Sequence, residues 1–310
     1  MPTKIRIGTA SWTDPGFIRD WYPRNLPASA RLRWYAEHFN YVELNSTFYA
    51  LPRIESVQRW CEETPKDFLF DVKLPKLLSR HSMEAKFLPP DLRLRVATRN
   101  RVVELSRNSE ELMVDRLLRE LAPLVHARKL GAFLLQLSPA FSPRAHSLTE
   151  LDSLIHLVAS HPLAIELRNR YWVSKDRIKE TVDYFRSRRV TLVLVDAPES
   201  EHFTVMPGLD CVTNPRLGYF RFHGRNAAGY IKGRSVAERF DYDYSESETK
   251  ELAERIRTVA EEVEEIRVVA NNNHSDYAPK LARRLQELLS VELQIREELD
   301  RRKAQQPELL

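Results

Sequence analysis

Short apolar segments alternate with amphipathic ones along almost the whole chain, and this alternation limits the fold more than any other feature of the sequence. Eight segments have the length and apolar content of buried strands: 5–9, 41–45, 68–73, 131–137, 163–168, 190–196, 218–223 and 266–271. The stretches between them space apolar residues as amphipathic helices do: 30–39, 53–63, 91–106, 109–128, 147–159, 175–188, 246–264 and 276–302. Such repeated strand-and-helix units predict an α/β protein, a (β/α)₈ TIM barrel in a single domain.

The expected barrel domain covers residues 1–290, with one long insertion. The segment between the third and fourth strands exceeds one crossover helix, and Pro89 and Pro90 interrupt it, so an extra helical insertion is expected at about 76–128. Residues 291–310 are rich in charge and are expected to form a helical C-terminal extension. A doubly wound sheet is the rival fold, but the 8 glycines of the chain form neither a GxGxxG nor a P-loop motif.

Several classes of protein are disfavoured by composition. There is no apolar run of about 18 residues, and the start of the chain lacks the apolar stretch of a signal peptide, so we expect a cytoplasmic protein with no membrane partner. The two cysteines, Cys61 and Cys211, have no metal-ligand spacing, which argues against thiolate zinc sites and disulfide scaffolds. A net charge of +4 allows an anionic partner without requiring one. Neither a cofactor nor an oligomeric state follows from the sequence.

Polar pairs end several of the expected strands. Side chains two positions apart share a face of a strand, as Glu43 and Asn45 do, while the apolar residues between them face the helices. The same spacing places further polar residues at the barrel mouth: Asp71 with Lys73, Glu166 with Arg168, and Arg221 with His223, joined by Gln136, Asp196 and residues 271–274. Barrel enzymes build their active sites at this end of the strands. The alternative interpretation is a set of ion pairs with a purely structural role.

We interpret this mouth as a pocket, free of metal, for a small anionic ligand bearing phosphate or carboxylate, or for a polyhydroxylated one. Glu43 or Glu166 is the expected general base, and His223 or His274 the expected acid. Ligand contacts are expected from Asn45, Lys73, Arg168, Asp196, Arg221, Arg225, Asn271, Asn272 and His274. Glu166→Gln and Arg221→Ala are expected to abolish ligand binding with little loss of fold.

The loop after the seventh expected strand, HGRNAAGYIKGRS, concentrates glycine and positive charge. It contains Gly224, Gly229 and Gly233 together with Arg225, Lys232 and Arg234. Loops after the last two strands of a barrel often bind phosphate, so this loop is expected to form an anion-binding lid. The alternative is a long solvated loop.

Two other kinds of chemistry can be drawn from the same strand ends. Glu166, Asp196 and His223 end consecutive strands and resemble the divalent-metal ligands of isomerase and endonuclease barrels, although Arg168 and Arg221 would repel a cation. A lysine that forms a Schiff base must lose its proton easily. Lys73 is not expected to do so, because Asp71 on the same face should keep it protonated.

A non-catalytic nucleic-acid binder is the competing class of function. Aromatic residues near the strand ends, with neighbouring arginines, suggest a surface for base stacking and phosphate contacts: Trp12, Phe17, Trp21, Tyr22, Phe48, Tyr49 and Trp172, with Arg19, Arg24, Arg53, Arg168 and Arg170. The same rings would equally well pack at the rim of the barrel.

Successive blocks of this sequence resemble those of the uncharacterised DUF72 family, the YecE-like proteins. They are IGTASW at 7–12, WYP at 21–23, YVELNSTFYALP at 41–52, Trp60 with TP at 64–65, FLFDVKLP at 68–75, QLSPAF at 136–141, AIELRNRYW at 164–172, YFRFHGR at 219–225 and NNNH at 271–274. The sequence departs from the family pattern at Ala10-Ser11 and at residues 78–81. The resemblance, which covers about residues 5–290, implies a (β/α)₈ barrel but no defined reaction.

Overall fold

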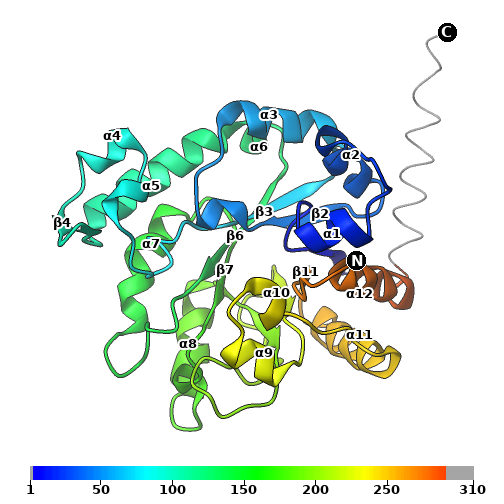
Figure 1. Cartoon of the computed structure of the whole chain (residues 1–310). Coiled ribbons are helices and arrows are strands. Elements are labelled where there is room, and N and C mark those ends of the chain that lie inside the picture. The colour runs from blue at the N-terminus through cyan, green and yellow to red at the C-terminus, as the bar shows by residue number, and fades with distance from the viewer. Residues whose placement is uncertain (1–2, 291–310) are drawn as a thin grey trace.

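The computed structural model describes residues 3–290 and has two parallel β-sheets at its centre (Figure 1). One sheet has the strand order β1 (Lys4–Thr9), β11 (Glu265–Ala270), β10 (Gly218–Phe222) and β9 (Leu194–Asp196). The other has the order β2 (Tyr41–Leu44), β3 (Leu69–Lys73), β6 (Leu130–Gln136), β7 (Leu163–Glu166) and β8 (Thr191–Leu192). The chain is therefore a mixed α/β protein whose central strands are parallel.

The two sheets meet where β8 passes into β9. Only Val193 separates these strands, and β8 pairs with β7 while β9 pairs with β10. The backbone amide of Val193 still donates to the carbonyl of Ile165, at 3.0 Å. A single extended segment thus forms one border of each sheet.

The opposite borders, β1 and β2, are joined through a side chain. The buried hydroxyl of Tyr35 accepts from the amide of Thr9 and donates to the carbonyl of Tyr41, both at 3.0 Å. Gly8 permits this approach, since a Cβ atom there would lie 2.2 Å from the oxygen of Tyr41. Within residues 3–290 no backbone ladder pairs β1 with β2, so the ladders alone do not close a barrel.

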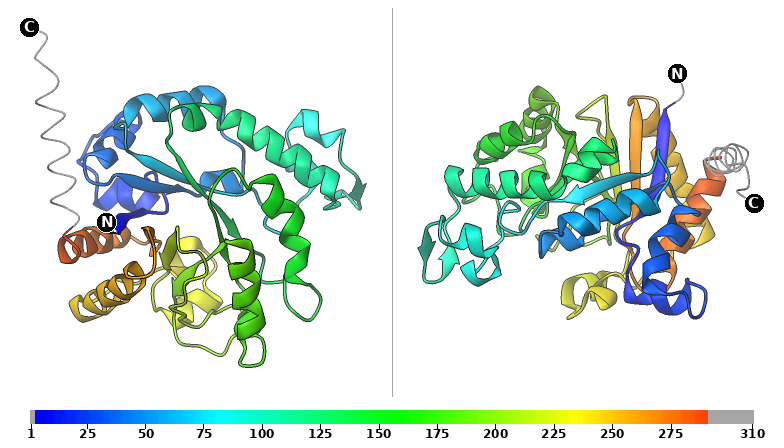
Figure 2. Two further views of the ribbon diagram at one scale, coloured as in Figure 1. Left: turned by 180° about the vertical axis from the view of Figure 1, so that it is seen from behind. Right: turned by 90° about the horizontal axis from the view of Figure 1, so that it is seen from above.

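Helices lie around the outside of the strands (Figures 1 and 2). They are α1 (Pro15–Asp20), α2 (Arg31–Ala36), α3 (Ile54–Glu63), α5 (Arg107–Glu120), α6 (Ala122–His126), α7 (Asp152–Leu157), α8 (Ile178–Arg188), α11 (Glu246–Ala260) and α12 (Tyr277–Leu288). Local sequence sets their ends: Ser245 caps α11 by accepting from the amide of Glu248, whose side chain accepts in return from the amide of Ser245. Apolar helix residues such as Leu281 and Leu285 fill the layer between helices and strands.

The segment between β3 and β6 differs from expectation in its first half. The helix predicted over 91–106 is wrong: α4 (Pro90–Arg93) is short, and β4 (Thr98–Arg99) pairs antiparallel with β5 (Val102–Val103). Asn100 and Arg101 make the turn with φ values of 50° and 67°. β-branched residues on both sides of a turn with positive φ favour a hairpin over a helix. In both figures this segment projects to one side of the molecule.

The C-terminal part agrees with expectation up to the end of α12 at Leu288. The predicted charged extension, residues 291–310, lies outside the described residues. The helices within residues 3–290 include none that is long and apolar enough to cross a membrane.

Candidate functional site

A buried ion cluster lies toward the carboxyl ends of three strands. Glu43 on β2, Glu166 on β7 and Arg221 on β10 all point into the interior because their apolar neighbours along each strand pack against the helices. Arg221 donates to the two carboxylate oxygens of Glu43, from Nε at 3.0 Å and from Nη2 at 2.7 Å. Its Nη1 donates to Glu166. We call these three residues the Glu43–Arg221–Glu166 cluster.

Three further side chains donate to Glu166. They are Nε2 of Gln136 at 2.9 Å, Nη1 of Arg168 at 3.1 Å and Nε2 of His223 at 3.2 Å. Burial opposes ionisation of this carboxyl group, but attraction to Arg221 and the hydrogen bond from His223 outweigh it and place the pKa of Glu166 well below its usual value. Glu166 is therefore ionised and fully engaged by donors.

His223 is held in one neutral form. The side-chain amide of Asn271 lies 2.8 Å from Nδ1 and donates to it, which leaves the ring proton on Nε2, facing Glu166. Burial lowers the pKa of His223 to about 4, although Glu166 opposes the shift. Around neutral pH the ring is therefore uncharged, which disfavours the role of general acid expected for His223.

A second buried layer lies below the cluster and takes up Asp71. The hydroxyl of Tyr41 and the amide of Ala132 donate to its carboxylate at 2.9 Å and 2.6 Å. Nε of Arg267 lies 3.4 Å from the same group. The expectation that Asp71 keeps Lys73 protonated is wrong, because its oxygens are occupied on the side away from the strand ends.

Lys73 ends β3 above this layer, with 9% of its surface exposed. Its Nζ lies 4.5 Å from the ring centre of Phe48, and no carboxylate in the described part of the chain forms an ion pair with it. Burial, reinforced by the charge of Arg221, lowers the pKa of Lys73 to about 7, while Glu43 and Glu166 limit the shift. The amine is therefore partly neutral at neutral pH.

Several polar atoms at this end of the strands are buried without a protein partner. They are Nε of Arg168, Oδ1 of Asn45, Asn272 and Asn273, and Nδ1 of His274. Buried polar atoms in proteins are nearly always hydrogen-bonded, so a group of unpaired ones indicates where polar atoms of a ligand would fit. Asn45, Lys73, Arg168 and Asn271 follow their strands at this end, and Asn271 contacts His223. The side-chain amide of Asn272 instead donates to the carbonyl of Tyr242 at 2.9 Å, and Nε2 of His274 lies 3.7 Å from Asp241.

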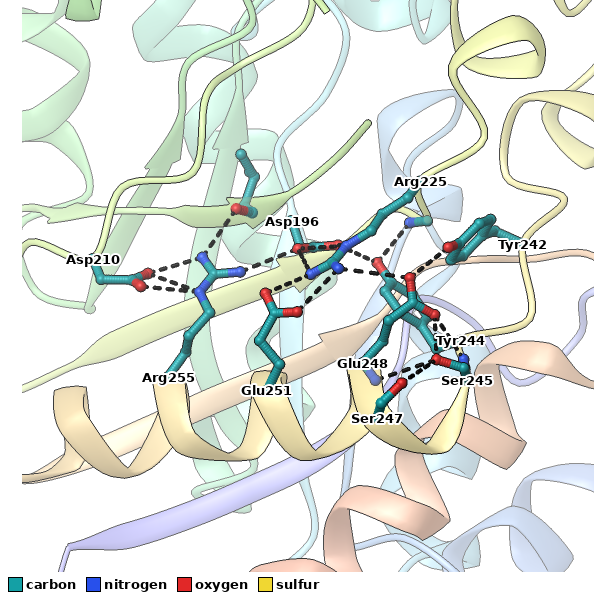
Figure 3. Close-up of polar contacts among 12 residues, drawn as sticks. Asp196, Asp210, Arg225, Tyr242, Tyr244, Ser245, Ser247, Glu248, Glu251 and Arg255 are labelled. Carbon is teal, nitrogen blue, oxygen red and sulfur yellow. Dashed lines mark hydrogen bonds and ion pairs between the residues drawn. The ribbon is translucent and has the colours of Figure 1, made fainter. Parts of the chain in front are cut away.

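Asp196 and Arg225 take part in a different set of polar contacts, with Tyr244 and residues of α11 (Figure 3). Asp196 is in register with Phe222, so both face the helices, and the carboxylate accepts from Arg225 at 2.8 Å and from Tyr244 at 2.6 Å. Arg225 also donates to Glu251 on α11 at 2.9 Å. The expectation that Asp196 and Arg225 contact a ligand is therefore replaced by a role in joining β9 to α11.

The loop after β10 covers the site with aromatic rings. It contains α9 (Ala227–Lys232) and α10 (Val236–Arg239), and it brings Phe240 into a stack with His223 at 5.6 Å between ring centres. The ring of Tyr230 lies 5.6 Å from the guanidinium of Arg168. Lys232 and Arg234 are exposed, so the loop does not have the cationic inner face predicted from its composition. Tyr230 and Phe240, in a loop interpreted only by its glycines and charges, were the signal that the sequence analysis missed.

The structure separates some of the residues on which the metal-binding and nucleic-acid-binding alternatives depend. Asp196 points away from Glu166 and His223, and residues 3–290 contain no group of three or more His, Cys, Asp or Glu side chains placed to hold a metal ion. Most rings of the suggested stacking surface are packed inside: Phe17, Tyr22, Phe48 and Trp172 are buried, and Trp12 and Trp21 pack against the core. Tyr49, by contrast, is 69% exposed.

These features define a mixed α/β protein with parallel sheets and a polar site at the carboxyl ends of their strands. Residues 6–307 match the family model described as "Protein of unknown function DUF72". The chain belongs to the DUF72 family, as its sequence blocks suggested.

Relatives and solved structures agree with this assignment. The UPF0759 protein YunF of Bacillus subtilis is 27% identical over 292 residues, which cover 93% of this chain and 95% of YunF. The UPF0759 protein YecE of Escherichia coli K12 is 30% identical over 198 residues, 62% of this chain and 59% of YecE. Crystal structures of DUF72 family proteins from Enterococcus faecalis and Thermotoga maritima superpose with TM-scores of 0.74 and 0.73, at 29% and 27% identity, and each covers more than nine tenths of both chains.

Proposed function

We propose that this protein is an enzyme that binds a small organic anion at the carboxyl ends of its strands and moves a proton on it. One observation carries the proposal: Arg168 presents a buried Nε without a protein partner, and the amine of Lys73 has no ion pair within residues 3–290, beside a cluster of charges that is already satisfied. Two such cations form a recognition site for carboxylate or phosphate oxygens. Oδ1 of Asn45, also buried without a protein partner, would bind a hydroxyl group of the same ligand.

The proposal includes a (β/α)₈ barrel as the scaffold. If β8 and β9 are counted as a single strand, eight strands follow one another around a closed ring in chain order: β1, β2, β3, β6, β7, β8 with β9, β10 and β11. Two observations support this circuit. The segment that contains β8 and β9 pairs with strands of both sheets, and the hydroxyl of Tyr35 connects β1 to β2. A barrel explains why residues 178 positions apart, Glu43 and Arg221, meet inside the molecule.

Within this site the residues would divide the work. Lys73, with its pKa lowered to about 7 by burial, is the group suited to give and take a proton. Glu43 and Glu166 set the charge of the site and orient Arg221 and His223. Nε of Arg168 would hold the anionic part of the ligand.

The test is ligand binding measured by calorimetry and thermal shift, with inorganic phosphate and pyruvate as probes. We expect both probes to stabilise the protein, and Arg168→Gln to weaken binding at least about ten-fold, or about 1.4 kcal/mol. Arg170→Gln is the matched control, because Arg170 lies two residues away and pairs with exposed Glu201. Equal affinities in all three proteins, or no stabilisation by either probe, would refute the proposal.

Arg221 is a poor probe of binding, contrary to the expectation that its removal would spare the fold. Its guanidinium is buried between two carboxylates, and burial is outweighed by Glu43 and Glu166, which raise its pKa. Removing one partner of a buried ion pair costs about 3–5 kcal/mol. Arg221→Ala would therefore unfold much of the protein before it informs on ligand binding.

A further inference from the structure

Two lysines are buried within residues 3–290, and they differ in what surrounds the amine. Nζ of Lys129 donates to the carbonyl oxygens of Cys61 and Thr64, at 2.6 Å and 2.7 Å, and to the hydroxyl of Thr64 at 2.9 Å. All three of its donor positions are used. Nζ of Lys73, by contrast, lies 4.5 Å from the centre of the Phe48 ring, a cation–π contact and not a hydrogen bond. The side chain of Lys73 is thus largely buried, and its amine has no hydrogen-bond acceptor within residues 3–290.

The nearby carboxylates compensate only in part for this lack, because other donors occupy their oxygens. Arg221 takes both oxygens of Glu43 and one of Glu166, whose second oxygen accepts from Arg168, Gln136 and His223. Arg221 and Arg168 also lie close enough for their charges to oppose protonation of Lys73. An unpaired buried ammonium beside cations readily becomes a neutral amine with a free lone pair.

We propose that Lys73 is a nucleophile that forms a Schiff base with an aldehyde or ketone bearing a carboxylate or phosphate group. The inference rests on the proposed function, since it names the substrate class of the same site. A desolvated lysine next to other cationic groups is a known arrangement for activating an amine toward carbonyl carbon. Arg168, with Nε free, is placed to hold the anionic group of such a substrate.

The reaction balances without an external reagent. The neutral amine attacks the carbonyl carbon, a C–N bond forms, and the π electrons of the C=O bond move to oxygen, which takes up a proton. The nitrogen then gives up one proton and the hydroxyl group takes up a second, which the ammonium released to the solvent when it became the neutral amine. The nitrogen lone pair forms a C=N bond while the C–O bond breaks and water leaves. Overall, one ammonium and one carbonyl group give one protonated imine and one water molecule, with no change in oxidation state. The positive charge of the imine replaces that of the ammonium, and the negative charges of Glu43 and Glu166 remain nearby.

Reductive trapping tests this step. The full chain is incubated separately with pyruvate and with glyceraldehyde 3-phosphate, treated with sodium cyanoborohydride, digested with trypsin and analysed by mass spectrometry. An alkylated Lys73 resists trypsin, so the adduct is expected on the peptide that spans residues 67–76. We expect Lys73 to be labelled at least about ten-fold faster than any other lysine, with Lys129 unlabelled as the internal control, and excess phosphate to slow the labelling.

Two variants complete the design. Lys73→Met should remove the adduct while the protein stays folded by circular dichroism, and Arg168→Gln should slow trapping at Lys73. Labelling spread evenly over the exposed lysines, or stabilisation by pyruvate and phosphate with no adduct at Lys73, would overturn the Schiff base and leave the proposed function intact. Absence of both stabilisation and adduct would overturn the two together.

Discussion

At the scale of single residues, the environment of Lys73 has a cost to stability that depends on pH. Its pKa is lowered to about 7 by burial, from 10.5 in an exposed lysine. Between these two values the unfolded chain binds a proton that the folded protein lacks, so this residue's contribution to stability rises with pH across that window. Below about pH 7 the folded protein carries the full penalty of the buried charge.

We therefore expect Lys73→Met to stabilise the protein, and more so in acid. The gain in free energy of unfolding at about pH 6 should exceed the gain at about pH 9 by about 2–3 kcal/mol, since each pKa unit corresponds to about 1.4 kcal/mol. Urea unfolding at both pH values measures it. Lys129→Met should instead destabilise at both values, because two backbone carbonyls would lose their donor. A gain for Lys73→Met that does not vary with pH would contradict a lowered pKa.

The sequence predicted part of the site because strand alternation is a strict rule. Glu43, Glu166, Arg221 and His223 each alternate with large apolar residues, so their inward direction follows from the pattern alone. The segment 190–196 has apolar residues on both faces, and the direction of Asp196 could not be predicted from it. The partners of Asp71 could not be predicted either, because Tyr41 and Arg267, from strands far apart in the sequence, take the oxygens that Lys73 was expected to pair with.

At the scale of elements, the border between β1 and β2 depends on one hydroxyl group. Tyr35→Phe would leave the buried amide of Thr9 and the carbonyl of Tyr41 without a shared partner. We expect a loss of about 1–3 kcal/mol in the free energy of unfolding, together with faster hydrogen exchange at Thr9. Chemical denaturation and exchange measured by NMR are the measurements.

Tyr22→Phe serves as the matched control for that prediction. Its hydroxyl donates to the carbonyl of Trp12 at 2.7 Å in the segment after β1, away from the pairing of strands. It should leave exchange at Thr9 unchanged. Similar exchange in both variants would show that the Tyr35 hydroxyl is not what joins the two sheets.

Elements with strong local signals were predicted well, whereas weak ones were not. The strand segments and α11, which begins with a complete capping box, lie close to their expected positions. The hairpin at 98–103 was missed because helical spacing of leucines in the preceding residues continues into it. Two positive φ values at Asn100 and Arg101, set by the turn itself, ended that spacing.

At the scale of the whole molecule, the shared segment 191–196 should couple the two sheets in unfolding. β8 pairs with β7 in one sheet, and β9 pairs with β10 in the other. Because β8 and β9 are parts of one segment, unfolding of one sheet should pull this segment away from the strand it pairs with in the other sheet. We expect circular dichroism in the far and near ultraviolet and tryptophan fluorescence to report one coincident transition in guanidinium. Separate midpoints for these probes would show that the sheets unfold independently.

The Glu43–Arg221–Glu166 cluster also favours the correct pairing register of the strands during folding. Its three members lie on strands that are far apart along the chain, and none of the charges can leave water cheaply until the other two have arrived. If β10 slipped by one residue, Phe220 or Phe222 would enter the interior and the guanidinium would be driven among the apolar side chains of the helices. A structure with β10 out of register would therefore be strongly destabilised by buried, unpaired charges. The cluster adds only modestly to the stability of the native fold, but it disfavours folds that differ from it by one residue of register.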